Sequence, residues 1–226
     1  MKKLSLGLAL LVLATLVLVP RAHAIVAGQV DTFENGTTMG WAHGVPGYLL
    51  NIDTGGPAGA GDHYLQLRAD GNGAGGRLTT FNLQQWLGNY IAQGITSLEI
   101  DLLNQGAVSL SIRFAFKSQN TQNAPGYLSS AMILPVGSGW QHFSIALTPA
   151  NFTAVGGPVA FNTFFSTGIG DARIINSVGT SNLNGDFVIG QVGIDNIRAV
   201  PEPGAVVLVL GGLLSLGGGR RFRARA

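Results

Sequence analysis

The strongest constraint on the fold of this chain is an alternation of apolar and polar residues with a period of two. Residues 64–68 and 97–102 alternate in this way, and residues 108–116 carry the longest run. A period of two is what a β-strand with one buried face requires. In the longest run the predicted buried residues are Val108, Leu110, Ile112, Phe114 and Phe116, and the predicted opposite face holds Ser109, Ser111, Arg113 and Ala115.

The rest of the central chain also favours strands. The pattern predicts further strands at 76–81, 128–134, 140–147, 160–166, 172–175 and 190–199. Turn-forming runs such as Asp53-Thr54-Gly55-Gly56-Pro57 separate them. Only residues 83–93 have the spacing of a short helix. Many strands without a strand–helix rhythm predict an all-β fold, a two-sheet antiparallel β-sandwich of jelly-roll type.

The N-terminal end has the features of an export signal. Lys2 and Lys3 precede an apolar segment at 4–19, and Ala22-His23-Ala24 has the small-residue pattern of a cleavage site. We therefore expect residues 1–24 to be a signal peptide, whose removal leaves Ile25 as the first residue of an exported domain at 25–199. The alternative is an uncleaved N-terminal anchor.

The C-terminal end, residues 200–226, combines three features in a fixed order. Pro201, Glu202 and Pro203 come first, an uncharged apolar run at 205–218 follows, and a basic cluster at 220–225 closes the chain. This order resembles the PEP-CTERM sorting signal of Gram-negative bacteria. The alternatives are an ordinary membrane anchor or a buried C-terminal helix, but a core helix is not normally followed by four arginines.

The resemblance implies partners and a route. An exosortase, a membrane-embedded transpeptidase, would read the Pro-Glu-Pro motif after the export machinery has moved the domain across the inner membrane. The apolar run would act as a hydrophobic sorting helix that associates with the inner membrane only transiently. The protein would then reach the cell surface or the extracellular matrix.

Removing both ends reverses the charge of the chain. The whole chain has a net charge of +2 and a pI near 9.2, whereas residues 25–199 hold six basic and ten acidic residues, about −4. The basic pI therefore comes from the targeting segments, and no nucleic acid is expected as a partner. The chain has no cysteine, which excludes disulfides, thiolate metal sites and cysteine nucleophiles.

Two segments at the ends of the domain carry a second resemblance. Residues 31–41 contain Phe33-Glu34-Asn35-Gly36 and end at Trp41, and Ile194-Asp195-Asn196-Ile197 stands near the domain's end. With the Trp140-led segment 140–148, they resemble galactose-binding-like jelly rolls, a fold of many non-catalytic carbohydrate-binding modules. The resemblance implies the same fold and points to sugar binding.

The same resemblance implies a structural Ca²⁺ between the first and last strands. Glu34 and Asp195 match the side-chain ligands, and Asp62, just before a strand, is a third candidate. Calcium takes six to eight hard oxygen ligands, so backbone carbonyls would complete the set. The alternative is that these carboxylates only accept backbone hydrogen bonds where the strands close.

No catalytic arrangement is recognisable, so we expect a protein that is not an enzyme. His43, His63 and His142 are scattered, and none belongs to a known catalytic motif. A glycosidase needs a carboxylate pair across a cleft, whereas Glu34 and Glu99 are the only glutamates of the domain.

Sugar rings stack on exposed aromatic side chains, and four are candidates for ligand binding. Tyr48 and Tyr127 lie beside glycines in expected loops, and Trp86 and Tyr90 stand four residues apart in the helix-like segment. Trp41 and Trp140 are expected in the core. The sequence thus favours a structural or adhesive protein of the exopolysaccharide or biofilm layer. The alternatives are a carbohydrate-binding module with a defined polysaccharide ligand and, more remotely, a secreted hydrolase.

Overall fold

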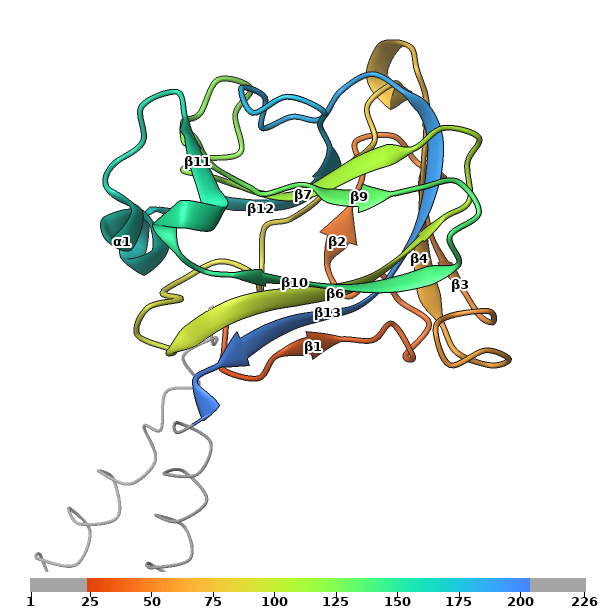
Figure 1. Cartoon of the computed structure of the whole chain (residues 1–226), viewed down its shortest axis with the longest axis horizontal. Helices are drawn as coiled ribbons and strands as arrows, with labels where there is room; N and C mark the ends of the chain where they lie inside the picture. The colour runs from red at the N-terminus through yellow and green to blue at the C-terminus, as the bar shows by residue number, and fades with distance from the viewer. Residues whose placement is uncertain (1–23, 204–226) are drawn as a thin grey trace, which may run out of the picture.

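Two antiparallel sheets lie face to face in the computed structural model, which describes residues 24–203 (Figure 1). Sheet A has the order β10 (Trp140–Ala146), β6 (Ile95–Asn104), β13 (Ile189–Pro201), β4 (Tyr64–Asp70) and β3 (Leu49–Ile52), and β1 (Val30–Asp31) also pairs with β13. Sheet B has the order β11 (Phe152–Val155), β8 (Gly126–Ser129), β7 (Leu110–Lys117), β12 (Asp171–Asn176), β5 (Thr79–Asn82) and β2 (Trp41–Ala42), and β9 (Met132–Leu134) also pairs with β7. The predicted all-β sandwich is confirmed.

Within the described residues, helical structure is limited to short turns. There are 3₁₀ turns at η1 (Gly73–Gly75) and η2 (Pro149–Asn151), a short α-helix α1 (Phe161–Thr163) and a π turn η3 (Phe164–Gly168). Within residues 24–203, no helix is long and apolar enough to cross a membrane. The expected signal peptide up to residue 23 and the sorting segment from residue 204 onward lie outside the described residues.

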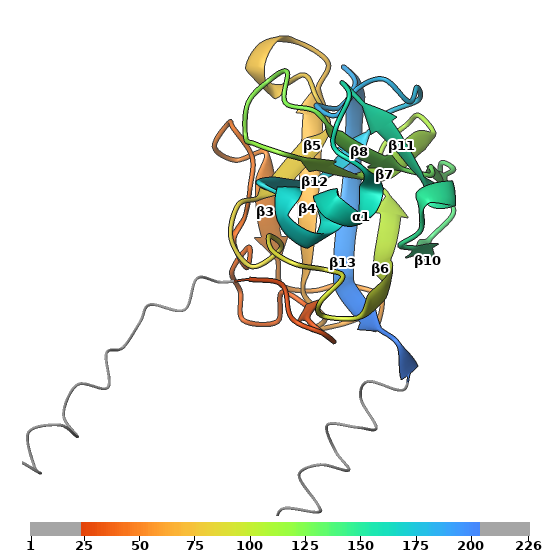
Figure 2. The ribbon, with the colours of Figure 1, turned by 90° about the vertical axis from the view of Figure 1, so that its left-hand side faces the viewer.

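One hydrophobic core lies between the two sheets, whose strands Figure 2 shows from a second side. The alternating residues of sheet A that were expected to be buried, such as Leu98, Ile100 and Leu102, are fully buried. Strand β7 contributes Leu110, Ile112, Phe114 and Phe116 from the facing sheet, as predicted. Val108 lies before β7 and is exposed, so its assignment to the buried face was wrong.

The opposite face of β7 corrects a further expectation. Arg113 and Ala115 were assigned to the face away from the core, and they do point there, yet both are buried. A second, smaller apolar cluster of Ala115, Leu128, Ile175 and Leu183 covers this outer face. The strand is therefore buried on both faces along most of its length.

Two predicted elements are wrong for local reasons. Residues 83–93 form turns instead of a helix, because Gly88 has a φ of +117° and its missing Cβ makes room for Ala24 and Ile25. Residues 160–166 form α1 and part of η3 instead of a strand. Phe161, Phe164 and Phe165 have a spacing of three and four residues, which places all three on one side of a helical turn and into the core.

Candidate functional site

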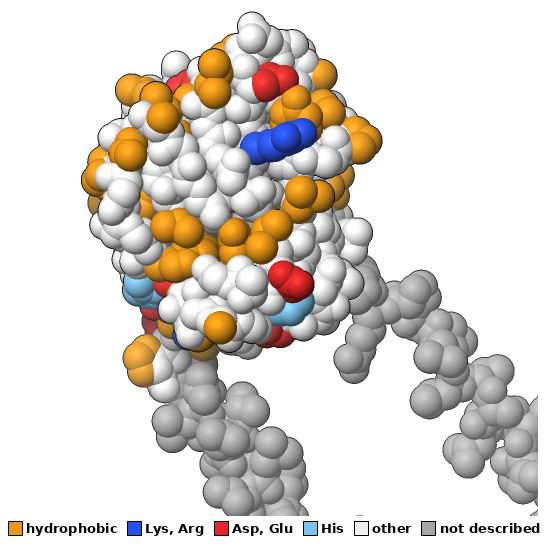
Figure 3. Space-filling view, turned by 90° about the vertical axis from the view of Figure 1, so that its right-hand side faces the viewer, with side chains coloured by type: hydrophobic (Ala, Val, Ile, Leu, Met, Phe, Trp, Pro, Cys, Tyr) orange, Lys and Arg blue, Asp and Glu red, His pale blue; other side chains and the backbone are white. Residues whose placement is uncertain are grey.

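The outer face of sheet A carries polar side chains and is covered only in part, since Tyr64 and Asp195 are buried on it while Gln66 and Gln191 stay half-exposed. The strand register brings Trp140, Leu103, Gly193 and Gln66 into one row across four strands, since each is the direct partner of the next. The next row contains Gln191, which pairs with Arg68. Figure 3, which views the side of β3 and β4, shows mostly uncharged and hydrophobic side chains with few charged ones.

Three glutamines from neighbouring strands form a hydrogen-bonded group, here called the glutamine platform: Gln66 of β4, Gln191 of β13 and Gln105 just after β6. The amides of Gln66 and Gln191 both donate to Gln105 Oε1, at 3.3 and 3.2 Å. Gln105 Nε2 in turn donates to the hydroxyl of Tyr64 at 2.9 Å. All three glutamines are half-buried, so their positions are fixed while part of each amide stays accessible.

Trp140 lies flat beside this platform. Its six-membered ring covers Gly193, where an added Cβ would come within 2.9 Å of the indole. The indole N–H donates to the carbonyl of Gly55 at 2.9 Å, and the ring of Tyr64 meets Trp140 edge-on, 5.4 Å between centroids. Trp140 is half-buried rather than in the core, so the expectation for this residue was wrong. The sequence signal for this position is Gly193, whose missing side chain leaves room for the Trp140 ring on the sheet surface, and the sequence analysis did not use it.

A cavity of about 380 Å³ adjoins the platform at the end of β4. Its lining includes Tyr48, Arg68, Asp70, Gln105, Ile189 and Gln191. The Tyr48 hydroxyl donates to Asp70 at 2.6 Å, which raises the pKa of Tyr48 and lowers the pKa of Asp70. His43 stacks on the Tyr48 ring at 5.2 Å, and the Arg68 guanidinium lies 4.6 Å from its centroid. Tyr48 therefore lines the site with its edge, because other side chains occupy its ring surface.

The other three predicted aromatic residues are in the core, which corrects their assignment as ligand-stacking residues. Trp86 and Tyr90 are fully buried, and Trp86 Nε1 donates to Asp31 at 2.6 Å. Tyr127 is buried among phenylalanines and its hydroxyl donates to the carbonyl of Val159. Burial leaves no free ring face for a ligand on these three residues.

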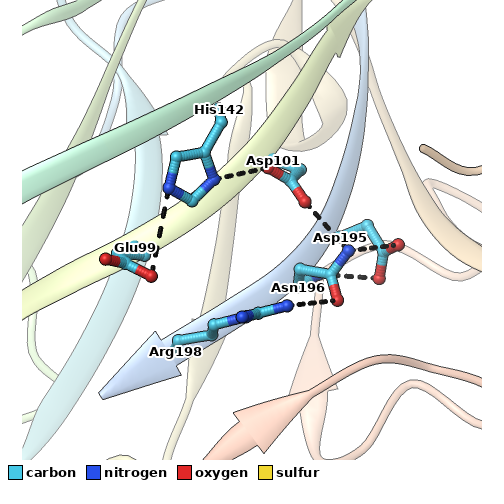
Figure 4. A network of polar contacts seen from close by, with 6 residues as sticks. All are labelled: Glu99, Asp101, His142, Asp195, Asn196 and Arg198. Carbon is cyan, nitrogen blue, oxygen red and sulfur yellow. Dashed lines mark hydrogen bonds and ion pairs between the residues drawn. The ribbon is translucent and has the colours of Figure 1, made fainter. Parts of the chain in front are cut away.

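A polar network occupies the next part of the outer face, toward the C-terminal end of β13 (Figure 4). Asp101 contacts His142 Nδ1 at 2.7 Å and accepts from Asn196 Nδ2 at 2.9 Å. Asn196 also donates its backbone and side-chain N–H groups to the two oxygens of Asp195. Asn196 has a φ of +49°, at the place where the β13–β6 pairing is irregular.

Asp195 is the carboxylate of this network with the most perturbed environment. It is 1% exposed, and burial raises the pKa of Asp195 to about 7, with smaller contributions from the negative charges of Asp62, Asp101 and Glu34. The sequence-predicted metal residues Glu34, Asp62 and Asp195 are thus electrostatic neighbours. Carboxylate oxygens are ligands that Ca²⁺ prefers, and these three side chains lie near one another without forming a compact cluster.

The same carboxylates have protein partners. Glu34 Oε1 accepts from the backbone N–H of His63 at 3.1 Å, and Asp62 Oδ2 accepts from that of Ala58 at 2.6 Å. Among residues 24–203, no three His, Asp or Glu side chains stand in an arrangement that could hold a metal ion. An ion at this place would therefore have to draw the ligands together and to use backbone oxygens.

The outer face of sheet B is closed by two loops, 118–125 and 177–188. Arg113 of β7 donates to the carbonyls of Ser177 and Ser129 at 2.8 and 2.7 Å. Lys117 donates to Asn184 Oδ1 at 2.7 Å, and burial lowers the pKa of Lys117 to about 8. A cavity of about 260 Å³ remains between these loops; its lining combines amide side chains such as Gln122 and Asn184 with the aliphatic Val155 and Leu183, and includes no aromatic ring.

The predicted sorting motif begins inside the domain. Pro201 is the last residue of β13 and pairs with Ile95 of β6, and the backbone N–H of Glu202 donates to the carbonyl of Gly94 at 2.9 Å. Pro203 is the last described residue. The motif thus starts directly at the edge of the folded domain, without a linker.

Comparisons with known proteins agree on the fold. No family model matches the chain, and no match was found among the curated proteins. A family 11 carbohydrate-binding module from Clostridium thermocellum, solved with a β-1,3-1,4-mixed-linked tetrasaccharide, has a TM-score of 0.51 at 13% identity, over 78% of this chain and 96% of the module. The family 11 module of a cellulosomal cellulase of Clostridium thermocellum gives 0.50 at 14% identity, over 78% and 95%.

An exo-beta-agarase is similar over one part of its length. It has a TM-score of 0.51 at 15% identity, and the match covers 78% of this chain but only 25% of the agarase. The chain therefore spans about a quarter of that enzyme. At these identities the similarities show the jelly-roll fold of carbohydrate-binding modules.

Proposed function

We propose that this chain is an exported, non-catalytic polysaccharide-binding protein that holds its ligand on the outer face of sheet A. The observation that carries the proposal is the difference between the two outer faces. Sheet B is closed by loops, whereas sheet A presents the glutamine platform with Trp140 on one side and the 380 Å³ cavity on the other. Trp140 of β10, Gln191 of β13 and Gln66 of β4 follow one another across the sheet, an arrangement that suits an extended chain.

The chemistry of this face suits sugars. Amide groups both donate and accept hydrogen bonds, as sugar hydroxyls do, and the three glutamines hold one another in place before a ligand arrives. Trp140 adds a partly exposed apolar ring surface beside them, which would bind the C–H face of a sugar ring. The solved modules named above support the proposal because they have this fold and one of them holds a tetrasaccharide.

The non-catalytic part of the proposal rests on what the carboxylates of this face do. Asp101 and Asp195 are both held by Asn196, and Glu99 lies 3.9 Å from His142. These groups are tied to one another rather than set on two sides of the platform. A hydrolase with a site elsewhere is the remote alternative, and the agarase covers too little of its own length here to favour it.

The cellular part of the proposal rests on the sequence. The N-terminal signal, the Pro201-Glu202-Pro203 motif, the apolar run at 205–218 and the basic end support export, an inner-membrane-held precursor and processing by an exosortase. The mature protein would have a structural or adhesive role in the exopolysaccharide or biofilm layer. Tight binding of one defined glycan would instead indicate a specialised carbohydrate-binding module.

We also propose that Ca²⁺ binds where β1 and β13 meet. Glu34, Asp62 and Asp195 would supply carboxylate oxygens, and the ion would neutralise the charge that now perturbs Asp195. Its role would be structural, joining the loops at residues 34 and 62 to the last strand.

A glycan array and polysaccharide affinity gels on the full chain test the binding proposal. We expect retardation that Trp140→Ala and Gln105→Ala each weaken, with the melting temperature measured to confirm folding. Thr153→Ala, an exposed change on the outer face of sheet B, is the matched control. Micromolar binding to a single glycan would favour the specialised module, and broad, weaker binding the adhesive role. Equal binding by all variants would reject this face, and no binding to any glycan would reject the function.

The processing proposal has its own test. Replacing Pro201, Glu202 and Pro203 by alanine should leave unprocessed protein in the inner membrane, held by the apolar run. Mass spectrometry of the mature wild-type protein should show that residues 220–225 are gone. Mature protein that retains these arginines would contradict exosortase processing while leaving the binding proposal intact.

A further inference from the structure

The chain leaves the described domain at one well-defined end of the sandwich. Strand β13 points out of this end, at the lowest point of the described ribbon in Figures 1 and 2. Two turns are tied to it by backbone hydrogen bonds: Gly28 N–H donates to Ala199 O, and Glu202 N–H donates to Gly94 O. We call the surface made by residues 26–30, 89–94 and 200–203 the exit face.

The exit face carries exposed aliphatic side chains. Val26 is 52% exposed and Ile91 is 43% exposed, and Val30 next to them is also exposed. The turns that hold Val26 and Ile91 are connected, because the backbone N–H of Ala27 donates to the side chain of Gln93 at 3.2 Å. These aliphatic residues are therefore neighbours on one surface although about 65 residues separate them in sequence.

The two turns contain no charge. Residues 26–30 read Val-Ala-Gly-Gln-Val and residues 88–96 read Gly-Asn-Tyr-Ile-Ala-Gln-Gly-Ile-Thr. Uncharged turns with exposed aliphatic tips can enter the headgroup region of a bilayer without the cost of desolvating a charge. Glu202 is the one charged residue of the exit face and is exposed, so its carboxylate would have to stay among the lipid headgroups.

The length of chain beyond the domain decides what this surface meets. Glu202 is held at Gly94, and the apolar run begins at Ala205, so only Pro203 and Gly204 lie between them. The three Cα–Cα steps from Glu202 to Ala205 span at most about 11 Å. If the run is embedded in a bilayer, the exit face has to lie against that bilayer.

We propose that the exit face is a membrane-contact surface, on which Val26 and Ile91 touch the lipid headgroup region while residues 205–218 hold the precursor in the membrane. This rests on the membrane-held precursor of the proposed function. It adds an orientation: the C-terminal end of β13 points toward the membrane, and the other end of the strand, at Ile189 beside the 380 Å³ cavity, points away from it. It also places the start of the Pro201-Glu202-Pro203 motif between the sheet edge and the lipid surface.

The absence of cysteine makes single-cysteine labelling a clean test. Val26→Cys and Ile91→Cys in the full chain would each carry an environment-sensitive fluorophore, and the protein would be reconstituted into vesicles of phosphatidylethanolamine and phosphatidylglycerol. Ile189→Cys is the matched control, because it is 73% exposed at the opposite end of the same strand β13. All three positions are exposed, so the substitutions should leave folding intact.

We expect the labels at 26 and 91 to shift to shorter emission wavelength in vesicles and to be quenched by headgroup-attached nitroxide lipids. They should also lose several-fold in quenching by aqueous iodide, whereas the label at 189 should not change. Labels at 26 and 91 that behave like the label at 189, on a chain that floats with the vesicles, would overturn the inference and leave the membrane-held precursor standing.

Two other outcomes are also decisive. A chain that does not float with the vesicles would contradict both the membrane-held precursor and the contact surface. Shielding of the labels at 26 and 91 that is already complete without lipid, and that depends on protein concentration, would show that a second copy of the chain covers the exit face instead. Polysaccharide binding is measured separately and is unaffected by either result.

Discussion

The outer faces of the two sheets come from the same kind of alternating sequence but have different surroundings. On sheet A the outward residues Gln66, Gln105 and Gln191 remain half-exposed and bond to one another. On sheet B the outward residues Arg113 and Ala115 are buried under loops from elsewhere in the chain. Alternation therefore identifies the side of a strand that faces the core, but it does not reveal whether the other side stays open.

The largest expected effect comes from replacing one outward-facing alanine on each sheet by aspartate, which tests this difference. Ala115→Asp would bury an unpaired carboxylate beneath the loops of sheet B. It should lower the free energy of unfolding by several kcal/mol, a large share of the total of about 5–15 kcal/mol for a typical domain. Ala146→Asp lies on the outer face of sheet A at its exposed edge and should cost little. Urea unfolding of both variants measures the difference, and equal losses would mean that the two faces do not differ as described.

The second prediction asks whether a bound Ca²⁺ stabilises sheet A in the way that the covering loops stabilise sheet B. At one hundred times its Kd, an ion that binds only the folded state adds about 2.7 kcal/mol, which raises the melting temperature of a domain of this size by roughly 5–10 °C. EDTA should lower the melting temperature of the wild-type chain by this amount. Asp195→Ala and Glu34→Ala should remove the response, whereas Asp53→Ala, in a turn, should keep it. A melting curve that EDTA leaves unchanged would reject the ion but not the fold.

Lys117 tests how firmly the loops close sheet B. Burial lowers the pKa of Lys117 from 10.5 to about 8. Between pH 8 and pH 10.5, Lys117 is therefore protonated in the unfolded chain but neutral in the folded domain. Stability should therefore rise as the pH increases from 8 toward 9.5, by at most about 1.4 kcal/mol per pH unit. Lys117→Met should flatten this rise in denaturant unfolding measured at several pH values. An identical pH dependence of both proteins would mean that water reaches Lys117 freely.

The smallest expected effect concerns the open face. Gln105 accepts from both other glutamines, so Gln105→Ala removes the centre of the platform. We expect a loss of about 1 kcal/mol in glycan affinity, roughly five-fold, as for a neutral hydrogen bond. Isothermal titration with the best array ligand measures it. Gln122→Ala, at the cavity over sheet B, should not change glycan affinity. If Gln122→Ala weakened binding more than Gln105→Ala, the glycan would bind on sheet B, which contradicts the proposal.

Much of the core could be read from the sequence, because the period of a strand is a local property. Leu110, Ile112, Phe114 and Phe116 were assigned correctly from their own spacing. The aromatic candidates were not, because the exposure of an aromatic ring depends on distant partners. Trp86 is held in the core by Asp31, 55 residues away, while Trp140 is drawn onto the surface by the carbonyl of Gly55, 85 residues away.

The sequence by itself determined the all-β sandwich and the side of most long strands that meets the core. The tertiary structure alone decided which outer face is open, because the closing contacts are long-range: Arg113 binds the carbonyl of Ser177, 64 residues later. It also decided that the Pro-Glu-Pro motif begins within a strand, since the donor at Glu202 and the acceptor at Gly94 meet only when β13 pairs with β6. Local periodicity fixes how a strand faces its core, while only the assembled sheets decide what covers it.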